Sequence, residues 1–359
     1  MDLEEQLRPA VFPLLNWFHD NARELPWRSD PTPYRVWVSE IMLQQTRVAA
    51  VLGYFARFMA ALPTVEALAD AEEDELLKLW QGLGYYNRAR NLQKAARQIV
   101  YDRGGVFPGS YEELLTLAGV GEYTAGAIAS IAFGEAVPAV DGNVLRVVTR
   151  LTGDAGDITK PETKARIRAA LAAVMPQNLP GTFNQALMEL GALVCLPNGA
   201  PECGRCPWQN LCAACREGKT DALPVKSPKR QRKAEGRTVY LIFRAGKVAL
   251  RRRPDSGLLR GLWEFPNVPD DQEDTLAQWG IADADTLDGP KARHIFTHIE
   301  WHMQSVQVFP AGDALPEGWV WADRAALEER YPIPNAFDGF RACVEGQLRQ
   351  ADAREGCEP

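Results

Sequence analysis

The sequence predicts a two-domain protein, with an all-helical domain first and a smaller mixed α/β domain after it. Apolar residues recur at three- and four-residue spacing over most of the first 194 residues, a pattern typical of amphipathic helices. Five cysteines cluster directly after that stretch, and strand-like runs begin only near residue 238. A chain of 359 residues is long enough to bury two separate cores.

The composition is that of an ordinary globular protein. Hydrophobic residues make up 46% of the chain and charged residues 24%. No apolar run approaches the roughly 20 residues that a transmembrane helix needs. The acidic start, Met1–Glu5, lacks the pattern of a signal peptide. We therefore expect a cytoplasmic monomer that has no membrane partner and keeps its thiols reduced.

The net charge of −7 conceals a strongly basic segment. Residues 226–253 hold eleven Lys or Arg and a single acid, whereas the parts on either side are acidic. A basic connector can contact the phosphates of a nucleic acid, or it can be a solvated linker. Both interpretations are open, and we place an interdomain linker at 222–236.

The first helical segments lead to a loop and then to a long helical pattern. They are a helix over 3–18, a proline-punctuated loop over 25–33 and a helix over 34–59. Glu40 shares one face of the long helix with Val36 and Leu43. A carboxyl buried among apolar neighbours has a raised pKa and suits a general acid, although most helical glutamates stay on the surface.

Glycines interrupt the helical patterns that follow, at 64–80 and 87–100. Between them, Gly82-Leu-Gly-Tyr-Tyr86 carries aromatic side chains that either insert into a duplex or pack a helix corner. Ser110-Tyr-Glu-Glu113 is a capping box that starts a helix ending near Leu117.

A Gly-Val-Gly turn, Gly119–Gly121, joins that helix to a second one over 122–132. Such a turn can present backbone N–H groups to one phosphate. Asp141 stands before Gly142 and an apolar helix, where the ordinary task of an aspartate is to cap the helix N-terminus. Helices are also predicted at 162–175, opened by a Thr159-x-x-Glu162 capping box, and at 183–194.

Five of the seven cysteines fall within 21 residues. In a reduced chain, such a cluster favours a metal or iron–sulfur site over disulfides. Two Cys-x-x-Cys pairs could hold zinc, or four thiolates could hold a [4Fe–4S] cluster. The five candidates are Cys195, Cys203, Cys206, Cys212 and Cys215.

After the basic segment, the residue pattern changes from one typical of helices to one that also predicts strands. Strands are predicted at 238–243, 247–251 and around 294–309, a short helix near 272–279, and helices near 323–330 and 335–348. This pattern indicates a mixed α/β domain over 237–348, followed by a tail over 349–359.

Several strings together resemble the adenine DNA glycosylases of the MutY type, in the helix-hairpin-helix glycosylase superfamily. The resemblance covers most of residues 20–215 and, more loosely, 237–347. The strings are Leu25–Arg28, Val36–Arg47, Gly82–Tyr86, the Gly119–Gly121 hairpin, Val140–Val144 and the cysteine cluster. The resemblance implies a helical glycosylase domain over 1–221, with its helix-hairpin-helix near 111–132 and its cluster loop at 195–212, and a Nudix-like domain over 237–348.

The resemblance also implies an activity. Such enzymes bind double-stranded DNA and excise adenine opposite 8-oxoguanine or guanine, after flipping the base out of the stack. It assigns protonation of adenine N7 to Glu40 and stabilisation of the oxocarbenium-like sugar to Asp141, with Tyr123 and Asn143 beside it. In a prokaryote, the enzyme would associate with the nucleoid.

Further site residues follow from the same resemblance. The adenine pocket would be lined by Leu25, Trp27, Arg28, Leu43, Gln185 and Met188. DNA would be bound by Gln45, Thr46, Tyr85, Gly119, Val120, Gly121, Phe296, Thr297 and His298. A [4Fe–4S] cluster would be held by Cys195, Cys203, Cys206 and Cys212, although the seven-residue first gap leaves open whether Cys215 replaces Cys195.

Two alternatives remain within reach of the sequence. One is a glycosylase for oxidised pyrimidines of the endonuclease III type, but those enzymes carry a lysine where this chain has Tyr123. Without an amine no imine forms there, so we predict a monofunctional glycosylase. The other is a non-catalytic DNA-binding module with structural zinc.

The C-terminal domain lacks the acidic Nudix box in 271–280, so we predict a damage reader and not a hydrolase.

Overall fold

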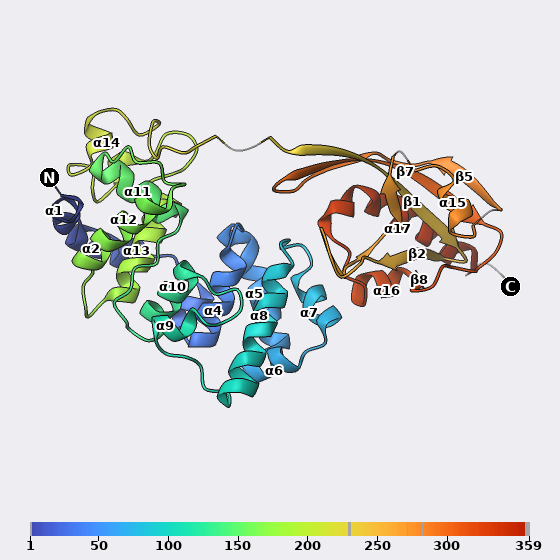
Figure 1. Ribbon diagram of the computed structural model, residues 1–359, viewed down its shortest axis with the longest axis horizontal. Coiled ribbons are helices and arrows are strands. Elements are labelled where there is room, and N and C mark those ends of the chain that lie inside the picture. The colour runs from blue at the N-terminus through green and yellow to red at the C-terminus, as the bar shows by residue number, and fades with distance from the viewer. Residues whose placement is uncertain (1, 229–230, 271, 282, 356–359) are drawn as a thin grey trace. The chain divides into compact units, whose positions relative to one another are not determined.

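The computed structural model describes residues 2–228, 231–270, 272–281 and 283–355, and its contacts divide the chain into two units (Figure 1). Unit 1 comprises Met1–Asp70 and Arg90–Pro228, and unit 2 comprises Ala71–Ala89 and Lys229–Pro359. The fold class is confirmed, because the first unit is helical and the second carries a mixed sheet.

The contact-based units and the sequence-based domain limits differ in one segment. Ala71–Ala89 groups with the C-terminal unit, since Lys78 Nζ donates to the Leu327 carbonyl at 2.8 Å and Asn335 Nδ2 to the Gly82 carbonyl at 3.0 Å. The sequence-based limits stay a prediction. Positions 229–230 of the linker and 356–359 of the tail lie outside the described residues.

Short helices build unit 1. They are α1 (Leu3–Leu7), α2 (Val11–Asn21), α3 (Pro26–Ser29), α4 (Pro33–Leu43), α5 (Val48–Ala61), α6 (Val65–Asp70), α9 (Tyr111–Leu114), α10 (Glu122–Ala132), α11 (Gly142–Thr152), α12 (Pro161–Val174), α13 (Pro180–Leu193) and α14 (Ala213–Arg216). Helix α7 (Glu73–Trp80) lies in unit 2, and α8 (Asn87–Arg97) crosses the division. No helix of the described residues is long and apolar enough to cross a membrane.

The helix predicted over 34–59 is wrong in one respect, because it is two helices. Helix α4 ends at Leu43 and α5 begins at Val48. Between them Gln45 has a φ of 58°, and the Thr46 N–H donates to the Leu43 carbonyl at 3.1 Å. No Gly or Pro marks this break, so the apolar period runs through it. The pattern at 64–80 likewise divides into α6 and α7.

One capping box is confirmed and one is wrong. The Ser110 hydroxyl accepts from the Glu113 N–H, and the Glu113 carboxylate accepts from the Ser110 N–H. The helix near 162 is capped by Lys160 instead, with Pro161 in its first turn. The Thr159 hydroxyl is occupied elsewhere, because it donates to Asp157 Oδ1 at 2.7 Å.

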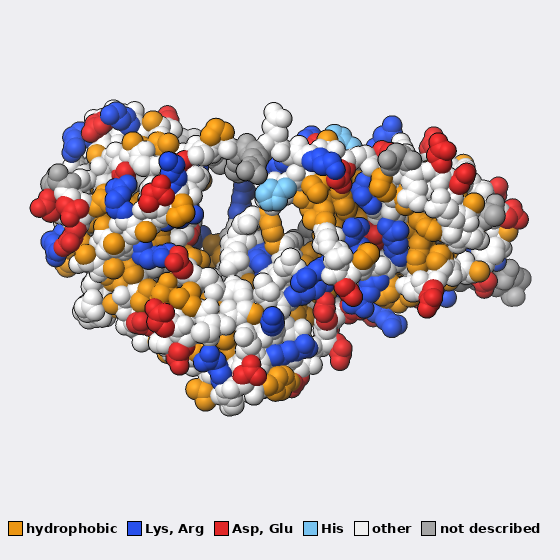
Figure 2. Space-filling view, in the orientation of Figure 1, with side chains coloured by type: hydrophobic (Ala, Val, Ile, Leu, Met, Phe, Trp, Pro, Cys, Tyr) orange, Lys and Arg blue, Asp and Glu red, His pale blue; other side chains and the backbone are white. Residues whose placement is uncertain are grey.

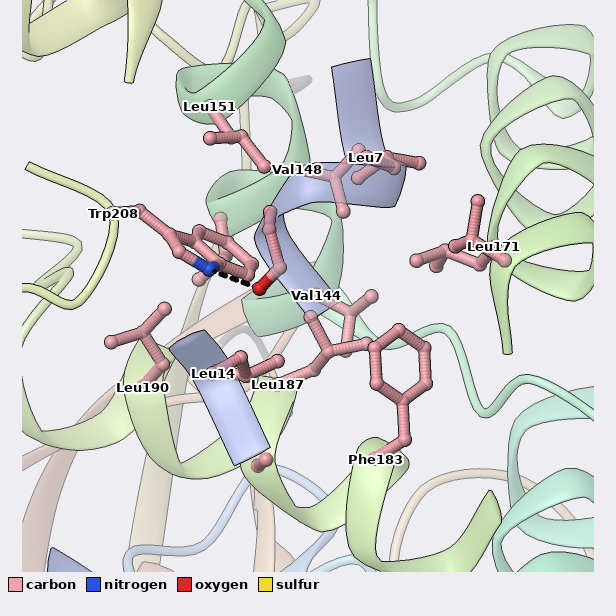
Figure 3. Packing of buried hydrophobic residues seen from close by; sticks show 14 of the residues in the cluster. Leu7, Leu14, Val144, Val148, Leu151, Leu171, Phe183, Leu187, Leu190 and Trp208 are labelled. Atoms are coloured by element: carbon pink, nitrogen blue, oxygen red, sulfur yellow. Dashed lines mark hydrogen bonds between the residues drawn. The ribbon is translucent and has the colours of Figure 1, made fainter. Parts of the chain in front are cut away.

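A buried apolar cluster ties the N-terminal helices to α11 and α13 (Figure 3). Leu14, Val148 and Leu190 are fully buried in it. Trp208, from the cysteine loop, inserts into the same cluster, and its indole N–H donates to the Ala10 carbonyl at 2.8 Å. The cysteine loop is thereby anchored in the core that carries α11.

Unit 2 is built on a mixed sheet in the order β3-β2-β1-β7-β5. The central strands β1 (Lys233–Arg244) and β7 (Ile299–Pro310) pair in parallel, and the other pairs are antiparallel. The remaining strands are β2 (Lys247–Arg252), β3 (Trp263–Glu264), β4 (Asn267–Pro269), β5 (Ala284–Asp288), β6 (Ala292–Ile295) and β8 (Trp319–Ala322). Its further helices are α15 (Thr275–Gln278), α16 (Arg324–Glu329) and α17 (Asp338–Glu355).

Much of the basic segment is folded into this sheet. Strand β1 begins at Lys233, inside the range predicted as linker, and it pairs with β7 from there. Arg237 lies over the Trp301 ring at 4.7 Å, and Arg251 pairs with the buried Glu264 at 2.8 Å. Figure 2 shows Lys and Arg side chains on the visible face of this unit. The solvated-linker interpretation therefore fails for the described residues from 233 onward.

Candidate active site

Glu40 is a buried acid on α4. Thr32 caps this helix, and Pro33 pre-sets its first turn. The Glu40 residue is only 6% exposed, so the surface interpretation is wrong. Its Oε2 accepts a 2.6 Å hydrogen bond from the hydroxyl of Tyr123, in the first turn of α10.

Burial raises the pKa of Glu40 to about 7, because a charged carboxylate loses its water shell there. The Tyr123 hydrogen bond opposes this rise, and so does the positive charge of Arg28. The nearby charge of Asp141 adds to it. A carboxyl with this pKa is a proton donor near neutral pH, as a general acid must be.

Asp141 caps α11 and faces the same site. Its Oδ1 accepts from the Val144 N–H at 2.8 Å, as an N-cap does. Its Oδ2 accepts from Asn143 Nδ2 at 2.7 Å. Burial raises the pKa of Asp141, whereas these N–H donors lower it by stabilising the anion. Both carboxyls are buried, but Asp141 has the more anion-stabilising surroundings.

Asn143 is held in place from its far side. Arg146 Nη2 donates to Asn143 Oδ1 at 2.9 Å and also to the Gly191 carbonyl at 2.9 Å. Arg146 Nε donates to the Cys195 carbonyl at 2.8 Å. The amide of Asn143 therefore has to present its NH₂ group to Asp141.

The pocket residues differ in how closely they meet the carboxyl pair. Met188 on α13 lies beside the site, because its sulfur accepts from the Tyr123 hydroxyl at 3.6 Å. Arg28 acts on Glu40 through its charge. Leu25 and Trp27 are buried, and Leu43 and Gln185 are half-buried. A place for these last four in an adenine pocket stays a prediction.

Sequence reasoning missed one acid in this region, Glu189 on α13. It is 1% exposed and pairs with both Arg23, at 2.7 Å, and Arg28, at 2.8 Å. In the sequence it looks like any helical glutamate. The available signal was that Glu189 is the single charged residue in the helical stretch 180–193, while two arginines, Arg23 and Arg28, stand in or beside the loop near residue 25.

The hairpin glycines have the geometry that the prediction requires. Gly119 has a φ of 74°, and a Cβ there would lie 2.6 Å from the Cβ of Asn91. Gly121 is exposed and caps α10 with extended backbone. Val120 is 6% exposed and packs inward, so only its backbone is available for a phosphate.

Two of the predicted DNA-binding residues, Gln45 and Tyr85, have an unusual backbone conformation. Gln45 in unit 1 and Tyr85 in unit 2 are exposed, and both have positive φ, 58° and 49°. Such strain in non-glycine residues is common at functional sites. Thr46, next to Gln45, is half-buried.

The predicted DNA-binding residues Phe296, Thr297 and His298 form the turn between β6 and β7. Phe296 packs against Trp301 at 4.9 Å and anchors the turn, while Thr297 and His298 are exposed. The Tyr85 hydroxyl, in the same unit, lies 3.4 Å from Thr297 Oγ1. These predicted DNA contacts therefore share one region of unit 2.

All five clustered cysteines line one cavity. Burial raises the pKa of Cys206 to about 12, so this thiol stays protonated unless a metal ion binds it. Among the described residues, no three His, Cys, Asp or Glu side chains converge on a single ion position. Cysteine thiolates are ligands both of zinc and of a [4Fe–4S] cluster, and the five thiols around this cavity are the donors that either group uses.

The fold and site define a base excision DNA repair protein. Residues 38–173 match the HhH-GPD superfamily of such proteins, and residues 238–341 match the NUDIX domain family. The mouse adenine DNA glycosylase is 38% identical, over 96% of this chain and 80% of the mouse protein. That of Buchnera aphidicola (from Acyrthosiphon pisum, strain APS) is 35% identical, over 72% and 74%. The chain belongs to the adenine DNA glycosylase family.

Solved structures resemble the helical part. A thermostable thymine-DNA glycosylase superimposes with a TM-score of 0.54 at 27% identity, covering 59% of this chain and 98% of that one. The match agrees with the helical architecture of unit 1.

Proposed function

We propose that this chain is a monofunctional glycosylase that excises adenine lying opposite 8-oxoguanine or guanine in duplex DNA. One observation carries the proposal. A buried Glu40, with a pKa of about 7, shares its site with Asp141, whose carboxylate accepts hydrogen bonds from the Val144 N–H and the Asn143 amide. Two carboxyls held in opposite protonation states are what acid-catalysed cleavage of a glycosidic bond needs.

The reaction begins with the adenine flipped out of the duplex, because its N7 is otherwise beyond reach of a buried acid. Protonated Glu40 donates its proton to adenine N7. The bond between the sugar C1′ and adenine N9 then breaks, and its electron pair leaves with the base. Since the base is already protonated, it departs as a neutral molecule and not as an anion.

Asp141 acts on the sugar that remains. Its anion stabilises the oxocarbenium-like cation electrostatically or captures C1′ covalently, and water then completes an abasic site. The bonds from Val144 N–H and Asn143 hold this anion in one orientation. Pre-oriented charge of this kind lowers the barrier without reorganisation during the reaction.

Tyr123 supports the monofunctional assignment. Its hydroxyl donates to Glu40, and no amine stands at this position to form an imine with the sugar. We expect no covalent adduct when the enzyme and its DNA are treated with borohydride. A robust adduct in that experiment would contradict the monofunctional assignment.

A [4Fe–4S] cluster held by Cys195, Cys203, Cys206 and Cys212 is part of the proposal, and Cys215 lines the same cavity. When bound, the cluster would cross-link the loop that carries its ligands. Iron content of Cys195→Ser and Cys215→Ser proteins tests the ligand set. Loss of iron only in Cys195→Ser supports the assignment, and loss only in Cys215→Ser reverses it.

The activity is tested with duplexes that hold adenine opposite 8-oxoguanine, guanine or thymine. Alkali breaks the strand wherever an abasic site has formed. We expect breaks at adenine opposite 8-oxoguanine and guanine, none opposite thymine, and none with Glu40→Gln. Absence of breaks with the unaltered chain would overturn the proposal.

A further inference from the structure

Glu189 is an acid that the proposed reaction does not use, although it lies one residue from Met188 of the site. It is 1% exposed, and two arginines from the segment before α4 surround it. A carboxylate is seldom buried without a partner, and two cationic partners exceed what one carboxylate needs. The excess positive charge calls for a physical explanation.

The two arginines bind Glu189 differently. Arg23 approaches with a fork, because its Nε reaches Oε1 at 2.7 Å and its Nη2 reaches Oε2 at 2.8 Å. The Arg23 backbone N–H adds a third bond to Oε1, at 3.0 Å. Burial raises the pKa of Glu189, but these bonds and those from Arg28 outweigh it and hold the pKa at about 2. The carboxylate is therefore a fixed negative charge.

Arg28 is held by its two terminal nitrogens. Its Nη2 donates to Glu189 Oε2 at 2.8 Å, and its Nη1 donates to the Arg23 carbonyl at 3.2 Å. The guanidinium also lies over the ring of Phe18, 5.3 Å from its centroid. These contacts fix the cation on the Glu189 side of α3.

The same cation acts on the catalytic acid. Glu40 is faced by Tyr123 from α10, Asp141 from the start of α11 and Arg28 from α3. The Tyr123 hydrogen bond and, to a smaller extent, the positive charge of Arg28 favour the ionised form of Glu40, which is the form that cannot donate a proton.

We propose that Glu189 is a positioning residue, which holds Arg28 away from Glu40 and offsets its charge, so that Glu40 keeps the proton that it delivers to the base. This inference rests on the proposed adenine excision. In this arrangement, Glu189 supplies the negative charge that pairs with Arg28.

Two single substitutions have opposite expected effects. In Glu189→Gln a negative charge is lost, so Arg28 favours ionised Glu40 more strongly and the pKa of Glu40 falls. In Arg28→Gln the positive charge is lost, and the pKa of Glu40 rises. Glu189→Asp keeps the charge and serves as the conservative variant. Arg23→Gln is the matched control, because it disturbs the same carboxylate but leaves Arg28 in place.

The test is single-turnover adenine excision from a duplex with adenine opposite 8-oxoguanine, from about pH 5 to about pH 9. The alkaline limb of the profile reports loss of the Glu40 proton. We expect Glu189→Gln to move this limb down by about one pH unit, which lowers the rate at pH 8 by about tenfold. We expect Arg28→Gln to move the alkaline limb to higher pH. The double variant, Glu189→Gln with Arg28→Gln, returns the limb toward its wild-type position, and Glu189→Asp and Arg23→Gln leave it unchanged.

A purely structural Glu189 would lower the rate equally at every pH and leave the limb unmoved, and that result overturns the inference. If Glu189→Gln fails to fold by circular dichroism, Arg28→Gln and Arg23→Gln decide. Coinciding limbs in those two proteins would also overturn it. If the unaltered enzyme does not excise adenine, the proposed function itself is contradicted. That result is seen before any variant is compared, so it cannot be confused with failure of the inference about Glu189.

Discussion

At the scale of single residues, Glu40 and Asp141 differ in the hydrogen bonds that their carboxyl groups accept. Both are buried, and burial alone would raise both pKa values. Glu40 accepts a hydrogen bond from the Tyr123 hydroxyl, whereas Asp141 accepts one from the Val144 backbone N–H and one from the Asn143 amide. The two N–H donors stabilise the Asp141 anion against its burial, and on this basis we assign Glu40 as the acid and Asp141 as the anion.

The first prediction concerns pH. Glu40 must be protonated, so the excision rate falls as pH rises above about 7, by about tenfold per unit. Asp141 must be ionised, so the rate also falls at the acidic end. Single-turnover rates across pH give this bell-shaped profile. A rate that increases steadily from neutral to alkaline pH would contradict the assignment of Glu40.

Tyr123→Phe tests the hydrogen bond that the Tyr123 hydroxyl donates to Glu40. The hydroxyl lowers the pKa of Glu40, so its loss raises that pKa further and moves the alkaline limb to higher pH. The ring and its packing are kept. Met188→Leu, which removes only the sulfur contact, is the control and should leave the limb in place. A downward shift in Tyr123→Phe would mean that the hydroxyl does not stabilise the Glu40 anion.

At the scale of elements, one turn serves both folding and chemistry. Asp141 caps α11 while its second oxygen faces the site. We expect Asp141→Asn to keep the cap, because Asn and Asp cap helices about equally, and to change stability by under about 1 kcal/mol. Excision should nevertheless be lost. Thermal unfolding, DNA binding and excision measured on one preparation distinguish the two roles. Loss of folding together with activity would return Asp141 to a structural role.

Close packing between α13 and α11 sets the position of Asn143. A Cβ on Gly191 would lie 2.7 Å from the Asn143 Cβ, which is too close for either helix to accept unmoved. Gly191→Ala should therefore cost about 1–3 kcal/mol and reduce excision by displacing Asn143 from Asp141. Gly204→Ala in the cysteine loop meets nothing within 4 Å and is the control. Unchanged excision in a destabilised Gly191→Ala protein would show that Asn143 does not need this support.

The sequence predicted elements better than their interruptions. Ser110 and Asp141 were identified as caps because capping is local chemistry, and both assignments are confirmed. The break after Leu43 was missed, since Gln45 takes its left-handed conformation without a glycine. Capping by Thr159 was wrong, because Asp157 competes for the hydroxyl. Asp157 lies two residues before Thr159, so this competing contact is local and the capping pattern alone does not reveal it.

The candidate site shows the same limit. Glu40 and Asp141 could be paired from motifs, but the burial of Glu40 and the Tyr123 bond needed the fold. No sequence motif marked Glu189 as a residue near the site. Its partners lie 166 and 161 residues away in the chain, so only folding brings them together.

At the scale of the whole molecule, the two units divide the proposed work. Excision residues lie in unit 1, and the exposed Thr297 and His298 lie in unit 2. We expect Thr297→Ala with His298→Ala to reduce the preference for adenine opposite 8-oxoguanine over adenine opposite guanine. Excision from the guanine mispair should be nearly unchanged, because no excision group is touched. Equal losses on both substrates would place these residues in general DNA binding.

The central claim is that Glu40 protonates the leaving base at N7, and one substrate tests it directly. In 7-deazaadenine a carbon replaces N7, so the base keeps its shape and its pairing edge but has no nitrogen to protonate there. The measurement is single-turnover excision of 7-deazaadenine and adenine, each opposite 8-oxoguanine, with DNA binding measured in parallel. We predict equal binding and excision of 7-deazaadenine slower by roughly 10²-fold or more. Excision of both bases at the same rate would contradict the account.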